Sequence, residues 1–526
     1  MLSRLPRFAA AIAMAVLGVL IAVSLPACVA DDLFAIAASG FHVAQDGDDA
    51  NDGSRARPWR TIQRAADALR PGETVYVHDG VYAEQVTINV SGNLAVGPVT
   101  FAAYPGARPI LDGTGIPIPE ENAALIRIEE RAHVVIDGFE LRNWKADAPT
   151  DFPTGILVLG SCVEITIRDC VVHDLGNNLP ALDGDGPFAN GIAVYGTRME
   201  ASRGIRIEGC ELYDLETGGS EALVINGNVD GFAILDNNIH HVNNIAIDCI
   251  GFEGTAPSPA VDFARNGIVA GNLIEETSGR GNAYYDDPYG ALGIYVDGGR
   301  DLRIERNTVR RTDFGIEISS EHTGRRAERI VVAGNLIAES RTAGLSVGGW
   351  IETWGGAAGV VIVNNTFVRN NSLRDARGEV AFLRHLDDVR FVNNVVLSND
   401  DGAFLLNEAR TGDEIRSESN LFFGTDETAD GLWIWNGVEI ERFSDYRHAS
   451  GNDATSIVED PRFVDPDRDD FHLRAESPCI DAGDDDAALG ADVRTDLDGD
   501  PRPIDGDRDG LAAVDLGADE FQPASD

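Results

Sequence analysis

Three consecutive repeats of the chain carry acidic residues at equivalent places. Segments 246–250, 293–297 and 315–319 alternate apolar residues with others, and the alternate positions include Asp248, Asp297 and Glu317. In a β-strand such positions point to one face, so the three acids would share an outer face. Two carboxyl groups on one face can act as general acid and base on a glycosidic bond. We predict Asp297 and Glu317 as this catalytic pair, with Asp248 as a third carboxylate.

The spacing of these acids bears on the reaction that they could perform. Asp297 and Glu317 are one repeat apart and two residues out of step, which places their Cβ atoms about 8 Å apart in a parallel sheet. Asp248 and Glu317 would share a column, about 9.6 Å apart. Carboxylates about 6.5–9.5 Å apart are typical of inverting glycosidases, so the spacing slightly favours inversion. Mutual repulsion should raise the pKa of at least one carboxyl group.

Polar and aromatic residues surround the acids in the sequence. Six of them are predicted to contact substrate: Tyr295, Glu321, His322, Trp350, Tyr285 and Asp286. Tyr295 and Trp350 would offer rings on which a sugar can stack. His322 would orient Glu321 or protonate a leaving group, and Glu253 adds a further carboxylate from a loop.

The same acids are compatible with two other roles. Clustered carboxylate oxygens are the ligands of Ca²⁺. In a chain with 87 acidic residues they could also be ordinary surface charge. No motif for an organic cofactor is evident, so Ca²⁺ is the one cofactor considered.

Repeated strands must position these residues. A small polar residue closes each of a series of short apolar segments: Cys170, Cys210, Asn238, Asn272, Asn307, Asn335, Asn365 and Asn394. The uneven intervals between them exclude helical repeats of fixed length and indicate coils of short strands joined by variable loops. The pattern predicts an all-β fold, a single-stranded, right-handed parallel β-helix with a stacked asparagine ladder.

Both ends of the coil have features of their own. A short amphipathic helix at 61–69 would cap the open apolar N-terminal end, as repeat folds require. We expect the β-helix to span 41–475 and a loop-rich acidic C-terminal cap to span 476–526. In the tail, Asp505, Asp507 and Asp509 match the start of a calcium loop, although Leu516 replaces the expected Glu. A structural Ca²⁺ and a solvated acidic turn both remain open there.

Two stretches resemble a known family. The starts FHVAQDGDDANDGS (41–54) and PWRTIQRA (58–65) resemble those of pectate-lyase-like β-helix proteins. The motifs SPCIDAG (477–483) and VDLGADE (514–520) resemble the tail of bacterial surface β-helix proteins of the choice-of-anchor type. The resemblance implies a right-handed parallel β-helix and export, but this fold carries lyases, hydrolases, epimerases and adhesins. Several such lyases use a lysine base beside bound calcium, whereas Lys145, the only lysine here, lies far from the acids in sequence.

Composition and the N-terminus indicate where the protein acts. The formal net charge of −45 argues against a nucleic-acid partner and slightly favours a neutral glycan. Residues 1–27 resemble a signal peptide, followed by a linker at 28–40. Leu25-Pro-Ala-Cys28 resembles a lipobox, which would lipidate Cys28 and give the only membrane attachment, and cleavage after Ala30 is the alternative. We expect a secreted or cell-surface monomer whose few cysteines form no disulfide scaffold.

The leading interpretation is a carbohydrate-active glycoside hydrolase that cleaves a polysaccharide. The alternative is a Ca²⁺-dependent, pectate-lyase-like polysaccharide lyase in which the acids bind the metal and an Arg acts as base. A third possibility is a non-catalytic glycan-binding protein or adhesin.

Overall fold

The computed structural model describes residues 40–523, apart from 119–122, 182–185, 286–288, 376, 400–401, 409–414 and 425–430. The expected signal peptide, Cys28, nearly all of the linker and Asp286 lie outside the described residues. Within the described part, no helix has the length and apolar character that a membrane span needs.

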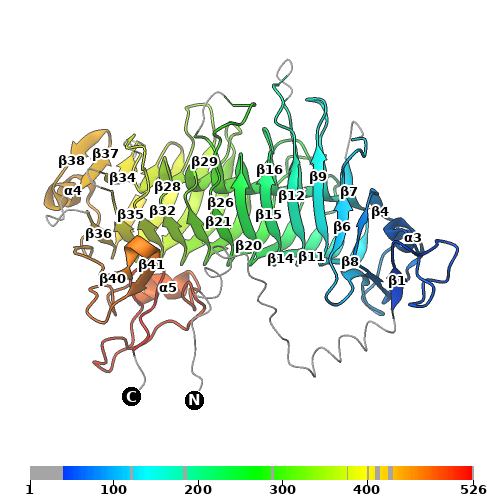
Figure 1. Cartoon of the computed structure of the whole chain (residues 1–526). Helices are drawn as coiled ribbons and strands as arrows, with labels where there is room; N and C mark the ends of the chain where they lie inside the picture. The colour runs from blue at the N-terminus through cyan, green and yellow to red at the C-terminus, as the bar shows by residue number, and fades with distance from the viewer. Residues whose placement is uncertain are drawn as a thin grey trace.

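Three long parallel sheets wind the chain into a right-handed β-helix (Figure 1). Each turn passes through sheet I, then sheet II, then sheet III. Sheet I contains β1 (Phe41–Val43), β2 (Thr74–Val77), β5 (Val99–Ala103), β8 (Ala132–Asp137), β11 (Val163–Arg168), β14 (Arg203–Glu208), β17 (Asp230–Leu235), β20 (Arg265–Ala270), β23 (Arg300–Glu305), β26 (Arg326–Ala333), β29 (Gly356–Val363), β32 (Leu386–Val392) and β35 (Ile415–Glu418). Sheet II contains β3 (Gly80–Tyr82), β6 (Pro109–Asp112), β9 (Glu140–Lys145), β12 (Val171–Gly176), β15 (Glu211–Leu215), β18 (Asn238–Val242), β21 (Leu273–Glu275), β24 (Thr308–Arg310), β27 (Leu336–Ala338), β30 (Thr366–Val368), β33 (Val395–Leu397), β36 (Leu421–Phe423) and β39 (Ile457–Val458).

Sheet III carries the predicted acids. It contains β4 (Val86–Ile88), β7 (Ala124–Glu129), β10 (Thr154–Leu159), β13 (Asn190–Gly196), β16 (Glu221–Gly227), β19 (Ile245–Ile250), β22 (Leu292–Asp297), β25 (Phe314–Ser319), β28 (Ala343–Val347), β31 (Val380–Phe382), β34 (Ala403–Asn407), β37 (Leu432–Trp435) and the antiparallel β38 (Val438–Ile440). Alternate apolar residues of all three sheets fill one continuous core, in which Ile247, Ile294 and Ile316 are fully buried. The five cysteines of the described chain are also buried, as free thiols.

The asparagine ladder runs along the corner between sheets I and II. Each side-chain amide donates to the carboxamide oxygen of the next, as from Asn272 to Asn307 at 2.9 Å and from Asn307 to Asn335 at 3.0 Å. The backbone N–H of Asn272 also donates to Asn307, so one oxygen serves two donors. The ladder is confirmed with one correction: its first asparagine is Asn237, which accepts from the Cys210 backbone at 2.9 Å, and not Asn238.

Separate elements close the two ends of the coil. At the N-terminal end α3 (Ile62–Ala68) is capped by Thr61, whose hydroxyl accepts from the Arg64 backbone, and its apolar face is buried. This confirms the expected capping helix. At the other end of the coil lies α4 (Phe443–Ser450) (Figure 1). Its Tyr446 packs onto Trp433, with ring centroids 5.3 Å apart.

The C-terminal segment lies along the side of the last coils. The coil ends at β39, and β40 (Phe463–Asp465), the 3₁₀ turn η2 (Pro466–Arg468), β41 (Asp470–Leu473) and α5 (Asp485–Gly490) follow outside the three sheets (Figure 1). The side chain of Asn364 donates to the Asp515 carbonyl, and the Ala518 N–H donates to Thr366, both at 2.8 Å. The acidic tail therefore covers a flank, whereas α4 plugs the open end.

Candidate active site

Sheet III places the predicted acids on neighbouring rungs. Asp248 of β19 pairs with Tyr295 of β22, which pairs with Glu317 of β25. Asp297 lies two residues further along β22 and pairs with Ser319. The register is therefore the one that the repeat spacing indicates, with Asp248 and Glu317 in one column and Asp297 beside it.

These side chains face outward from the coil but are hidden from solvent. Asp248 is 2 % exposed, Tyr295 3 %, and Asp297 and Glu317 4 % each. Trp350, from the loop between β28 and β29, packs against this part of sheet III and meets Phe314 at 5.4 Å between ring centroids. Strand alternation fixes the face of the sheet on which a residue lies, whereas loop packing decides whether water reaches it.

Glu317 has the most defined surroundings of the acids. The indole N–H of Trp350 donates to Glu317 Oε2 at 2.8 Å. Burial raises the pKa of Glu317 to about 8; the Trp350 hydrogen bond opposes this, and the charge of Glu321 adds to it. Glu317 is therefore largely protonated at neutral pH and can donate a proton.

A cavity of about 340 Å³ adjoins Trp350. Its lining consists of Trp350, Asp375, Arg377, Arg384, Leu406, Glu408 and Ile434. Arg384 Nη1 donates to the Trp350 carbonyl at 2.7 Å and lies 3.1 Å from Glu408, while Arg377 stacks over the indole at 4.7 Å. The two arginines come from different loops without a sequence motif, so sequence reasoning did not identify them.

Burial dominates the electrostatics of the other two acids. It raises the pKa of Asp248 well above its usual range, and the charges of Glu221 and Asp297 add to it. Burial and then the charge of Glu321 raise the pKa of Asp297, although Asp297 Oδ1 accepts from the Glu321 backbone at 2.8 Å. Repulsion between like charges, the cause expected from the sequence, is thus secondary to loss of water.

Glu221 is an acid of this site that sequence reasoning missed. It is 8 % exposed at the start of β16, and the Ser220 hydroxyl donates to its carboxylate at 3.0 Å. Burial and the charge of Glu253 raise the pKa of Glu221 to about 8. Alternation along the strand assigns Glu221 to the interior face, so the sequence pattern does not predict it as a residue of the outer site.

The predicted substrate-contacting residues are distributed around the acids. Tyr285 is 41 % exposed and meets Tyr284 edge-on, and its hydroxyl reaches Asn244. Glu321 is exposed and His322 is half-buried, in the loop after β25. His322, Glu253 and Asp297 offer ligand atoms that all lie within 4.8 Å of one another, the spacing of a metal site.

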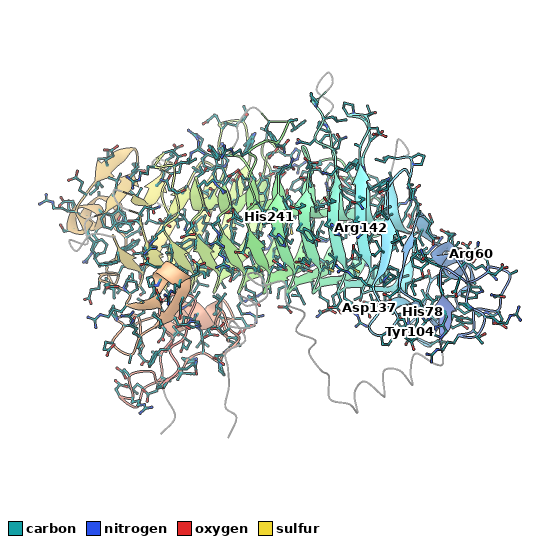
Figure 2. The ribbon with its side chains drawn as sticks, in the orientation of Figure 1. Arg60, His78, Tyr104, Asp137, Arg142 and His241 are labelled. Atoms are coloured by element: carbon teal, nitrogen blue, oxygen red, sulfur yellow. The ribbon has the colours of Figure 1, made fainter. Side chains whose placement is uncertain are left out.

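Other predicted features lie elsewhere on the molecule. Lys145 pairs with Glu216 at 2.7 Å and lines a cavity of about 460 Å³ on the sheet II side, near His241, which Figure 2 labels. In the tail, Asp505 and Asp507 group with Asp481 within 4.8 Å. Asp509 is not a member of this group and accepts from the Leu511 backbone at 2.8 Å, so the structure groups two of the three predicted residues with Asp481. The loop closes onto Asp481, which the motif alone could not reveal.

Comparison with known proteins agrees with this architecture. The family described as "Pel9A-like, right handed beta helix region" matches residues 41–255, and "Right handed beta helix region" matches residues 154–367. The protein YwoF of Bacillus subtilis (strain 168) is 35 % identical over 438 residues, which cover 83 % of this chain and 91 % of YwoF.

Solved structures of similar shape include two carbohydrate-active enzymes. Pectate lyase Pel9A is 14 % identical with a TM-score of 0.46, and the match covers 92 % of this chain and 97 % of that structure. A GH136 lacto-N-biosidase from Eubacterium ramulus is 16 % identical with a TM-score of 0.49, over 72 % of this chain and 67 % of that one. With its match to YwoF, the chain belongs to the same family as that protein, and its three parallel sheets give it the right-handed β-helix fold.

Proposed function

We propose that the protein is an exported, polysaccharide-cleaving glycoside hydrolase in which Glu317 is the general acid and Asp297 the opposing carboxylate. The observation that carries this proposal is Glu317 itself, a buried carboxyl group that accepts a hydrogen bond from Trp350, and the Trp350 side chain in turn lines a cavity. A general acid must keep its proton at the working pH, and burial of Glu317 provides this.

The reaction assigns a separate task to each carboxyl group. Glu317 donates its proton to the glycosidic oxygen as the bond to the leaving sugar breaks. Asp297, one rung away and two residues further along, must be ionised to direct a water molecule to the anomeric carbon and take up its proton. Because burial raises its pKa, this step requires that the buried carboxyl group first lose its own proton. Asp248, the third carboxylate, lies in the same column of sheet III as Glu317 and adds a polar group to the site. The substrate approaches by way of the Trp350 cavity, whose indole and two arginines can contact sugar rings and hydroxyl groups.

The experiment is product analysis on a panel of polysaccharides with the purified protein. Hydrolysis gives products that have each gained one water, seen by mass spectrometry. Glu317→Gln and Asp297→Asn should each lower kcat by at least about a hundredfold with the fold intact. Glu379→Gln is the matched control, since Glu379 is 1 % exposed and burial raises its pKa to about 8 as well. If Glu317→Gln kept full activity, the assignment would be wrong.

A metal-assisted polysaccharide lyase is the second candidate. The metal-type grouping of Glu253, Asp297 and His322 favours it, because a bound cation can acidify the proton beside a uronate carboxylate. Arg377 or Arg384 would then act as base. Lyase products lack the added water and carry a new C=C bond. Retained glycan binding without turnover would instead support a binding protein or adhesin.

A further inference from the structure

We propose that Glu253, Asp297 and His322 form a binding site for a divalent transition-metal ion of the Zn²⁺ or Mn²⁺ type. The site lies at the corner where the chain leaves sheet III for sheet I. Its location explains how residues 69 positions apart in sequence meet, from Glu253 to His322.

The repeat geometry brings one ligand from each of three successive turns. Glu253 follows β19, Asp297 ends β22 and His322 follows β25, and these strands are neighbours in sheet III. One carboxylate oxygen from each acid and one imidazole nitrogen all lie within 4.8 Å of one another. An ion about 2.1 Å from each ligand needs these atoms no more than about 4.2 Å apart, so side-chain movement of less than about 1 Å closes the site.

Unpaired buried polar atoms provide an independent sign of a missing ligand. His322 Nε2, Asp248 Oδ1 and Ser319 Oγ are buried and have no hydrogen-bond partner among the described residues. Ser319 is fully buried and pairs with Asp297 in the sheet, and the charges of Asp297 and Glu253 act on Asp248, which is 2 % exposed. Buried polar groups normally find partners, and an ion with its bound water would supply them.

The absence of salt bridges to these clustered carboxylates in the described structure also favours a bound cation. Within the described chain, no salt bridge involves Asp248, Glu253, Asp297, Glu317 or Glu321, although the charge of Arg377 acts on Glu317. The nearby Arg300 and Arg325 instead stack over the ring of Phe252, at 5.3 and 4.8 Å. A divalent ion would supply the positive charge that these arginines do not bring to the carboxylates.

Outer hydrogen bonds hold two of the ligands in place. Asn226 donates to Glu253 Oε2 at 2.7 Å, and the Glu321 backbone donates to Asp297 Oδ1 at 2.8 Å. One oxygen of each carboxylate is thereby fixed while the other can face an ion, as is typical around metal ligands. The imidazole favours a transition metal over Ca²⁺, which takes oxygen ligands.

A bound ion would also take part in the proposed hydrolysis. Three protein ligands would leave a coordination position for the attacking water, and the ion would hold that water beside Asp297, which takes up its proton. This role rests on the proposed hydrolase activity, whereas the binding of the ion does not.

The test measures metal binding without substrate. The protein is stripped with chelator, titrated with ZnCl₂, MnCl₂ and CaCl₂ by calorimetry, and analysed for bound metal by mass spectrometry. We expect His322→Ala and Glu253→Gln each to bind one equivalent of Zn²⁺ or Mn²⁺ fewer than the unchanged protein, with unaltered circular dichroism. His385→Ala, a loop histidine outside the cluster, should retain full binding.

Equal metal content in His322→Ala and the unchanged protein would overturn the site, as would the absence of Zn²⁺ and Mn²⁺ binding in both. A clear preference for Ca²⁺ over both ions would also overturn it. The two proposals fail separately: loss of one equivalent in His322→Ala with full activity in Glu317→Gln would keep the metal site and reject the hydrolase. Unchanged metal content with an inactive Glu317→Gln would do the reverse.

Discussion

Glu317 illustrates how a single residue derives its chemistry from its surroundings. Burial raises the pKa of Glu317 to about 8, so the acid form predominates below that pH. If this proton is donated in the reaction, kcat/KM should fall as the pH rises through about 8, tenfold for each further unit. A rate profile between pH 5 and 10 measures this. A profile that kept rising above pH 9 would contradict the role of Glu317 as acid.

Trp350 affects the pKa of Glu317 through one hydrogen bond. Its indole N–H stabilises the charged form of Glu317, so Trp350→Phe should raise the pKa of Glu317 further. A hydrogen bond to a charged group contributes about 1.5 kcal/mol or more, which corresponds to a shift of about one pH unit. The pH at which the rate falls on the alkaline side of the profile should rise by that amount. Trp354→Phe, in the same loop, serves as the control and should leave that pH unchanged.

The asparagine ladder is the element that fixes the coil along its length. Asn307 is fully buried and accepts from both the backbone and the side chain of Asn272. Asn307→Ala leaves those donors unsatisfied, and we expect it to lower the free energy of unfolding by about 1–3 kcal/mol. Urea unfolding followed by circular dichroism measures the change. Asn89→Ala removes an exposed hydrogen bond to Asp67, and its unfolding midpoint should stay within error of the unchanged protein.

The whole molecule should be more stable in mild acid than in mild base. Burial raises the pKa values of Glu221, Glu317 and Glu379 to about 8, above the ordinary value of 4.5. The folded state therefore binds these protons more tightly than the unfolded chain, and the stability that they contribute is complete below about 4.5 and lost as the pH rises through about 8. Protonation also reduces the net charge of −45 and its self-repulsion.

Calorimetry on the chelated protein should show a Tm several degrees higher at pH 5.5 than at pH 8.5. The Glu379→Gln variant should show a smaller difference between the two pH values, because one of the three groups no longer titrates. A Tm that was higher at pH 8.5 would mean that the buried carboxyl groups are ionised in the folded protein.

The sequence by itself determined the strands, the ladder and the face on which each acid lies. Alternation is a property of the strand backbone, and equal residues in successive repeats must stack when the coil forms, so Asp248, Tyr295 and Glu317 could be assigned to one column. The amphipathic helix at the N-terminal end follows from the same local periodicity.

Only the tertiary structure decided the environment of those acids. Burial of Glu317, its hydrogen bond from Trp350, the cavity that Trp350 lines and the meeting of Glu253 with His322 all depend on how loops from different turns pack together. The packing of the C-terminal segment against the flank, with Asp481 in place of Asp509, depends on the same kind of contact. Such contacts join residues far apart in the chain, and no short-range pattern in the sequence encodes them.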